Sequence, residues 1–145
     1  MTLQNMEARL CLMAAVALAA GTLIYLYARA TPVPTSTLAL CLGSLPTLLH
    51  TAAFTILSLA VVAPWPRLVP VVCAAWLAIE CAFEALQSPA IADAMNLSTL
   101  GAHSSLLRAY LHGTFDPVDP LAAGMGAVLA GCIAVSTGNH RVQRP

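Results

Sequence analysis

The chain contains no lysine, and charged residues of any kind make up only 8% of its 145 residues. A soluble domain carries about 25% charged residues, so this chain cannot cover a water-facing surface. With 59% hydrophobic residues, its composition indicates an integral membrane protein. Six arginines balance six acids to give a net charge of zero, which argues against a nucleic-acid partner.

Signatures of metal or nucleophile chemistry are also lacking. There is no CxxC, no HExxH and no Cys/His ligand spacing, so the sequence names no particular cofactor or metal and leaves open whether the protein is an enzyme. The simplest interpretation of the five cysteines is as small buried apolar side chains: Cys11, Cys41, Cys73, Cys81 and Cys132.

What the chain does have is long apolar runs. Four of them come close to the ~20 residues that cross a bilayer, over residues 10–28, 45–63, 68–87 and 120–137. They predict an all-α membrane protein: a four-transmembrane-helix bundle in one integral membrane domain over residues 1–145. An outer loop over residues 88–119 contains a short predicted interfacial helix between the third and fourth spans. The apolar face of that predicted helix is formed by Leu100, Leu106, Leu107, Tyr110 and Leu111.

Prolines and polar residues mark the ends of these spans. Ser44 is predicted to be the N-cap of the second helix, with Pro46 in its first turn, and the short run 38–42 either extends or precedes that helix. Pro89 ends the third helix, and Asp119 is predicted to be the N-cap of the fourth. The string Ala28-Arg29-Ala30 resembles a signal-peptide cleavage site, but the apolar run before it is long for a signal peptide. A retained first helix is therefore favoured.

The last span carries two series of small residues spaced by four. Ala122, Gly126 and Ala130 form one series. Ala123 and Ala127 begin the other, which ends at residue 131 with glycine. Small side chains let helices approach closely in lipid, so this helix is predicted to pack tightly against its neighbours.

The arginines indicate how the spans are oriented. With four helices, one side of the membrane receives four arginines (Arg9, Arg67, Arg141 and Arg144), and the other receives Arg29 and Arg108. By the positive-inside rule, both termini are predicted to lie in the cytoplasm and the chain to be a multi-pass protein of the cell membrane.

Polar residues from separate segments converge toward the opposite, outer leaflet. Glu80, Glu84 and Gln87 share one face of the third helix because residues three and four apart are neighbours. An acid at a helix centre costs about 2.5–3.5 kcal/mol to insert, and such groups usually face a bundle interior or a wet cavity. The candidate ligand-binding residues at this depth are His50, Glu80, Glu84, Gln87, Arg108, Asp116 and Asp119.

Each of these residues also has a purely structural interpretation. The two glutamates and His50 can hydrogen-bond neighbouring helices. Asp119 can cap its helix, and Asp116 can cap the turn before it. Arg108 can bind lipid phosphate without belonging to a site, and Trp76, beside Glu80 on the third helix, is interpreted as packing.

Several strings resemble the VanZ-like family of small multi-spanning bacterial membrane proteins. They are Leu45-Pro-Thr-Leu-Leu-His50-Thr-Ala-Ala-Phe54, Glu84-Ala-Leu-Gln87 and Gly113-Thr-Phe-Asp116-Pro-Val-Asp119, followed by Gly126. The chain departs from the family pattern at Ala123, where many relatives have asparagine. It also lacks an arginine just before the aspartate pair, so His112 or Arg108 would have to substitute. The family's namesake is associated with low-level resistance to teicoplanin, which binds cell-wall precursors. The resemblance implies a membrane location and an outward-facing polar site, and it supplies no substrate.

Four functions are consistent with these patterns. The first is an outward-facing polar pocket that binds an envelope lipid or glycan-lipid headgroup, with membrane lipids and a lipid-linked envelope precursor as partners. The second is an intramembrane metal-dependent hydrolase, with His50, Glu84 and Asp116 as ligands and Glu80 as general base. The third is a proton-coupled transporter, which needs a homo-oligomer because four helices are few for a pathway. The fourth is a scaffold or assembly subunit.

Overall fold

The computed structural model describes residues 3–30, 37–94 and 116–139, and these residues form helices and turns without a strand. The helices are α1 (Leu3–Ala30), α2 (Thr37–Val61), the 3-10 helix η1 (Pro66–Leu68), α3 (Val69–Gln87), α4 (Pro89–Ala94) and α7 (Asp119–Asn139). Four segments are long and apolar enough to cross a membrane: Asn5–Ala28, Gly43–Val61, Pro66–Gln87 and Asp119–Thr137. The four predicted apolar runs are therefore helices of spanning length, and the first begins earlier than predicted.

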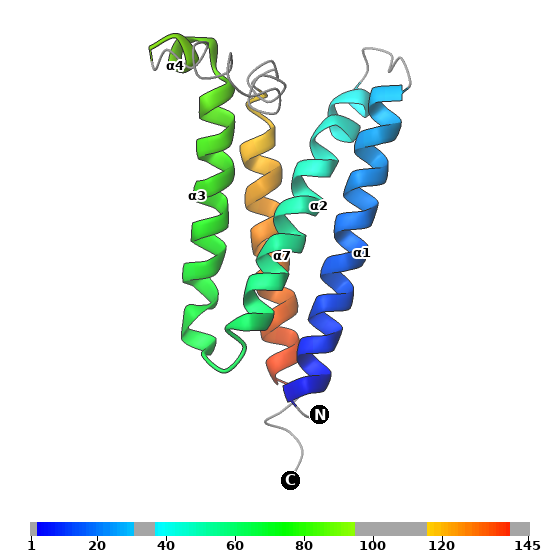
Figure 1. Cartoon of the computed structure of the whole chain (residues 1–145), viewed down its shortest axis with the longest axis vertical. Coiled ribbons are helices and arrows are strands. Elements are labelled where there is room, and N and C mark those ends of the chain that lie inside the picture. Colours follow the sequence, from blue (N-terminus) through cyan, green and yellow to red (C-terminus); the bar gives the residue numbers. More distant parts are fainter. Residues whose placement is uncertain (1–2, 31–36, 95–115, 140–145) are drawn as a thin grey trace, which may run out of the picture.

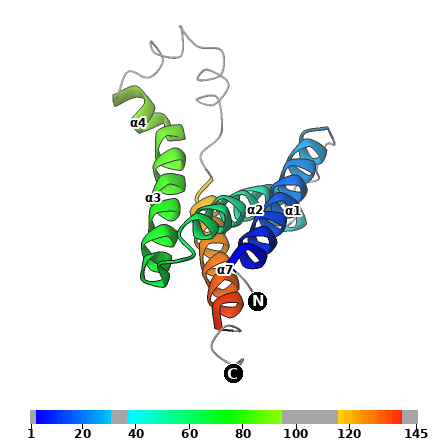
Figure 2. The same cartoon turned by 60° about the horizontal axis from the view of Figure 1, so that its bottom comes forward.

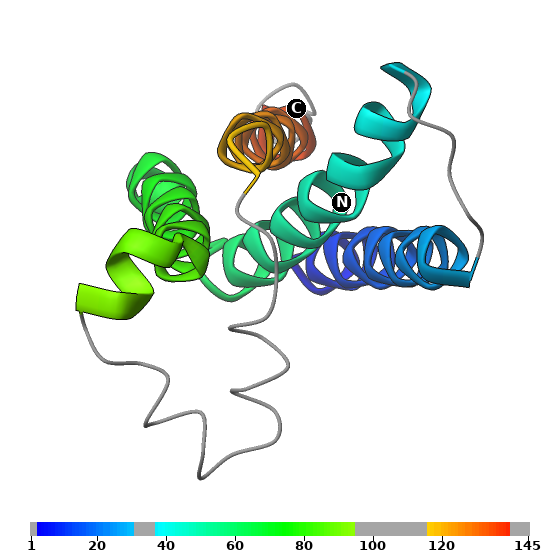
Figure 3. The same ribbon diagram turned by 90° about the horizontal axis from the view of Figure 1, so that it is seen from above.

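The four long helices run alongside one another (Figure 1). Helix α1 begins and α7 ends at what is drawn as the lower end, while α3 ends and α7 begins at the upper end. Seen from above, α2 crosses between α1 on one side and α3 and α7 on the other (Figure 3). In keeping with this view, α2 packs most extensively on α1 and α7, and α3 packs mainly on α7. Helix α2 therefore joins α1 to α7, and α3 is held mainly by α7.

The outer surface of the helices is apolar. Large hydrophobic side chains are exposed on each long helix, among them Leu23 of α1, Val61 of α2, Val71 of α3 and Leu121 of α7. Water would disfavour such a surface, whereas lipid tails accept it. Cys11, Cys81 and Cys132 are exposed in the same way, so the prediction that the cysteines are buried is wrong for these three. A lipid-facing position is as apolar as a core position, which is why composition could not separate the two.

The buried apolar core lies toward the lower end. It joins Met6, Leu10 and Ala14 of α1 to residues near the end of α2, of which Ile56 and Leu59 are the largest. The buried polar residues that the structure describes are Ser44, Thr51 and Thr55 of α2 and Glu84 of α3. The interior therefore combines an apolar core around α1 and the end of α2 with buried polar residues on α2 and α3.

The start of α2 differs from the prediction. The helix begins at Thr37 and continues through Pro46, so Ser44 is a buried helical residue and not an N-cap. The run 38–42 extends the helix, which is one of the two predicted alternatives. Proline inside a helix removes one backbone hydrogen bond, but membrane-spanning helices tolerate this because neighbouring groups can satisfy the freed carbonyl.

The end of α3 follows the prediction. The helix ends at Gln87, and Ser88 is extended, with φ −64° and ψ 125°, because the residue before a proline avoids the helical region. Pro89 then opens α4, a six-residue helix that was not predicted. Figure 2 shows α4 turned away from the axis of α3. The predicted interfacial helix, with its apolar face over residues 100–111, lies outside the described residues.

The small residues of α7 make the close contacts that their spacing predicted. Ala122, Ala123, Ala127 and Ala130 are buried. A side chain at Gly126 would collide with the carbonyl oxygen of Leu48, in the backbone of α2. A side chain at residue 131 would lie 3.2 Å from the sulfur of Cys73 in α3. One series therefore packs on α2, and the glycine that ends the other faces α3.

Trp76 packs between helices, as predicted. Its ring stacks on Phe54 of α2 with ring centroids 5.2 Å apart and planes 15° apart. The indole N–H also donates a hydrogen bond of 2.9 Å to Ser58 Oγ, which was not foreseen. These two contacts fix the rotation of the lower half of α3 against α2.

Candidate functional site

Glu84 is the most buried carboxylate among the described residues, with 8% of its surface exposed. It lies one turn before the end of α3, and its Oε2 accepts a hydrogen bond of 3.3 Å from the backbone N–H of Asp116. This bond joins α3 to the turn that precedes α7, across 32 positions of sequence. Part of the role of Glu84 is therefore structural.

Asp116 shapes that turn. Its Oδ1 accepts the N–H of Val118 at 2.9 Å, and its backbone carbonyl accepts the N–H of Asp119 at 3.1 Å. The first backbone bond of α7 runs from Ala122 N–H to Val118 C=O, so Val118 is the N-cap and Asp119 is the first helical residue. The predicted N-cap role of Asp119 is wrong by one position because the side chain of Asp116 organises the turn.

Asp119 is thereby free to face α2. It is half-buried, and its carboxylate lies close to the hydroxyls of Ser44 and Thr47. Within the residues that the structure describes, Asp119 Oδ1 and Ser44 Oγ are both buried, and neither atom makes a hydrogen bond. Ser44 itself is only 5% exposed. Buried polar atoms are normally hydrogen-bonded, so this pair is the least satisfied part of the upper end.

Glu80 completes the group of acids. It is half-buried one turn below Glu84, and its carboxylate lies next to the hydroxyl of Thr51 on α2. Glu84 is close enough to interact electrostatically with the other three acids. We call these four residues, Glu80, Glu84, Asp116 and Asp119, the carboxylate cluster. It lies at the upper end of the bundle in Figure 1, where α3 ends and α7 begins.

His50 is not part of the carboxylate cluster. Its ring lies against α1, where a side chain at Gly21 would come within 2.9 Å of the ring carbon Cδ2. Its Nε2 is 3.4 Å from Thr22 Oγ1. Gln87 is half-buried at the last position of α3. Arg108 and His112 lie outside the described residues. Of the predicted site residues, the structure brings together the four acids.

Sequence reasoning missed the hydroxyls of α2 that face the acids. Ser44, Thr47 and Thr51 are spaced by three and four, and the series continues with Thr55 and Ser58. This spacing places all five on one helical face. The spacing of these hydroxyls is visible in the sequence. Serine and threonine are common in membrane helices, however, so the spacing alone does not indicate a site.

The chemistry available to the cluster is that of oxygen atoms. Carboxylates accept hydrogen bonds or pair with cations, and hydroxyls both donate and accept. Within residues 3–30, 37–94 and 116–139, no three His, Cys, Asp or Glu side chains are grouped so that they could hold a metal ion. The ligand set His50, Glu84 and Asp116 is thus not assembled in the described structure.

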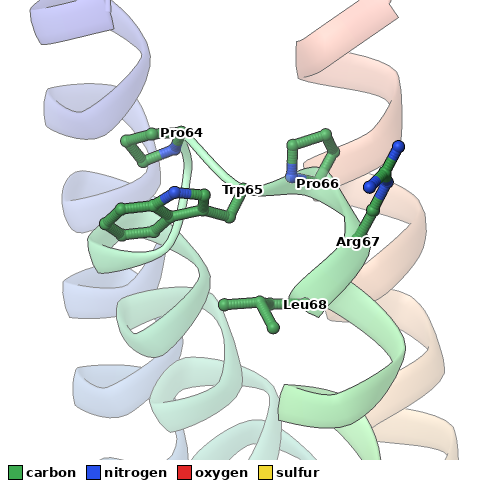
Figure 4. Close-up of a pocket in the computed structure, with 5 residues that line it drawn as sticks. All are labelled: Pro64, Trp65, Pro66, Arg67 and Leu68. Atoms are coloured by element: carbon green, nitrogen blue, oxygen red, sulfur yellow. The ribbon is translucent and has the colours of Figure 1, made fainter.

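A separate hollow lies at the lower end, away from the acids. It measures about 630 Å³ and is lined by the turn between α2 and α3, from Pro64 to Leu68 (Figure 4). Trp65 and Arg67 of this turn are exposed, as suits residues at a membrane–water interface. The residues that line the hollow include one cation and no acid, so its charge is opposite in sign to that of the carboxylate cluster.

These features define an all-helical protein with four helices suited to crossing a membrane and an acidic polar cluster between three of them. Comparisons of the chain with models of known protein families, with curated proteins and with solved structures find no match.

Proposed function

We propose that the chain is a multi-pass membrane protein whose carboxylate cluster binds the headgroup of an envelope lipid or glycan-lipid. The observation that carries this proposal is the pair Asp119 Oδ1 and Ser44 Oγ, which lie close together and are both buried without a hydrogen-bond partner among the described residues. Glu84 already has a backbone partner. The unused binding capacity therefore lies on Asp119 and Ser44, at the junction of α7 and α2.

The chemistry of the cluster fits a headgroup that offers hydrogen-bond donors. Sugar hydroxyls or an ammonium group donate to carboxylate oxygens, and a serine hydroxyl can serve as donor or acceptor to the same group. Arg108 would contact a headgroup phosphate. The resemblance to the VanZ-like family, which stays a prediction, also implies an outward-facing polar site.

We further propose that both termini lie in the cytoplasm and that the cluster faces the outer leaflet. The four-to-two division of arginines supports this orientation. Fusion of green fluorescent protein to either end of the chain is expected to give fluorescent cells, since this reporter folds in the cytoplasm. Fusion of alkaline phosphatase to either end is expected to give no activity. Active phosphatase at both ends would reverse the proposed orientation.

The substitution Asp119→Asn tests the binding proposal. It keeps the size of the side chain and removes a charged acceptor that makes no hydrogen bond through Oδ1, so the fold should persist. Loss of one charge-assisted hydrogen bond of about 1.5 kcal/mol corresponds to about ten-fold weaker binding. Mass spectrometry of lipids that co-purify with the protein is expected to show this loss.

Asp93→Asn is the matched control, because Asp93 is an exposed acid of α4 at the same end of the molecule. It is expected to leave the co-purified lipid unchanged. If Asp119→Asn and the wild type retain the same lipids in the same amounts, the headgroup site does not exist at this position.

A scaffold or assembly role is the second candidate, and a specific contact favours it. The bond from Asp116 N–H to Glu84 uses a buried glutamate to hold α3 against the start of α7. Glu80 likewise lies beside a hydroxyl of α2. In a scaffold, these acids would fix how the helices pair, and neutral variants that fold normally would lose no lipid and no phenotype.

A further inference from the structure

Five hydroxyl side chains form a row along one face of α2. They are Ser44, Thr47, Thr51, Thr55 and Ser58, with spacings of three, four, four and three residues. At 1.5 Å per residue, the row extends over about 21 Å of the helix axis. This is a large part of the hydrocarbon thickness of a bilayer, which is about 30 Å. We call this set the hydroxyl row.

Polar groups of α3 and α7 lie against the hydroxyl row at several heights. At the upper end, Asp119 is close to Ser44 and Thr47. One turn lower, Glu80 lies beside Thr51. At the lower end, Trp76 donates to Ser58 over 2.9 Å. The row therefore forms one wall of a polar seam, with the carboxylate cluster at its upper end.

Thr55 lies between these contacts and is the most informative residue of the row. It is 0% exposed, and its Oγ1 has no hydrogen-bond partner within the part of the chain that the structure describes. Thr51 is also 0% exposed, but its hydroxyl donates to the carbonyl of Thr47 at 2.8 Å. Valine would fill the place of Thr55 without leaving a buried polar atom unsatisfied. Because buried hydroxyls normally have a hydrogen-bond partner, a water molecule that enters the seam would bond to Thr55.

We propose that the hydroxyl row and the carboxylate cluster form a hydrated proton path through the membrane. Protons enter from water at the upper end, and Glu80 and Glu84 can hold and release them, as acids in membrane proteins commonly do. Water bonded by Thr51 and Thr55 carries them toward Ser58, from which three residues remain to the end of the span at Val61. Each proton that enters from water at one side leaves to water at the other. This activity does not depend on headgroup binding.

The test uses the full-length protein in liposomes of phosphatidylethanolamine and phosphatidylglycerol that contain a pH-sensitive dye. A potassium gradient with valinomycin drives protons inward, and the dye reports the rate. The wild type is expected to raise this rate above that of protein-free liposomes. The substitution Thr55→Val removes one hydrogen-bonding position from the path, which is expected to slow the flux roughly ten-fold.

Thr22→Val is the matched control because Thr22 is an exposed threonine of α1 that belongs neither to the hydroxyl row nor to the carboxylate cluster. It is expected to conduct like the wild type. Thermal unfolding of Thr55→Val should equal or exceed that of the wild type, so that lower flux cannot come from misfolding. Two outcomes overturn the proposal: a wild-type rate equal to that of protein-free liposomes, or a wild-type flux that Thr55→Val leaves unchanged.

Discussion

Replacing Gly126 with alanine is expected to destabilise the protein, although alanine is the better helix former. In a helix interior, alanine is favoured over glycine by about 1 kcal/mol. At Gly126, however, the new methyl group would collide with the carbonyl oxygen of Leu48 and lie 3.1 Å from the backbone nitrogen of Ala52. Backbone atoms cannot rotate aside, so α7 and α2 must separate. Overpacking of this kind costs about 1–3 kcal/mol.

Two other glycines provide controls for this prediction. A methyl group at Gly124 would meet only Leu77 Cδ1, at 3.8 Å, so Gly124→Ala is expected to be neutral or slightly stabilising. A methyl group at Gly21 would meet the ring of His50, which can rotate, and would lie 3.1 Å from Leu49 Cβ, which cannot, so Gly21→Ala is expected to have an intermediate effect. Thermal unfolding in detergent measures all three variants. Equal stability of Gly126→Ala and Gly124→Ala would contradict the close α2–α7 contact.

The second large effect is expected at Glu84. Alanine at this position leaves the N–H of Asp116 without its acceptor, and an unsatisfied buried donor costs about 1–3 kcal/mol. The glutamine variant keeps a carbonyl oxygen at the same reach. It also removes a charge that is unfavourable when buried. Glu84→Ala should therefore unfold at a lower temperature than the wild type, and Glu84→Gln at the same temperature or a higher one.

This pair of variants also separates the hydrogen bond from the charge. If Glu84→Gln proves as unstable as Glu84→Ala, the negative charge at Glu84 stabilises the start of α7 and the single hydrogen bond does not. A carboxylate near a helix N-terminus has that capacity. Proteolysis between α4 and α7 gives an independent readout, because loss of the bond releases the turn at Asp116.

The sequence predicted the membrane spans well because each is a long apolar run bounded by proline or charge. The runs over residues 45–63, 68–87 and 120–137 agree with the apolar helical segments of the structure to within two residues at each end. The errors arose where local signals compete. Pro46 was interpreted as the start of α2, but the apolar residues before it continue the helix. Asp119 was predicted to be the N-cap, but the side chain of Asp116 accepts the N–H of Val118 and so fixes the turn one residue earlier.

The sequence predicted at which depth along the helices the site residues lie, but not toward which neighbouring helix each side chain is turned. Counting residues along each span placed Glu80, Glu84, Asp116 and Asp119 near one end of the bundle, and the structure brings them together. The same count included His50, which lies at a neighbouring depth but faces α1. The rotation of a helix in lipid is set by packing against its neighbours. That packing depends here on contacts such as Gly21 with His50, which no single run of sequence reveals.

The contact between α7 and α2 also bears on the order in which the bundle assembles. A ribosome releases α1 and α2 first, and these two are neighbours in both sequence and space. Helix α7 emerges last, yet its main partner is α2, made much earlier. Chain segments generally fold in the order of synthesis, so α7 packs against α2 and α3 after these two helices are in place. A helix that arrives last and presents alanine and glycine on that side displaces no large side chains as it docks.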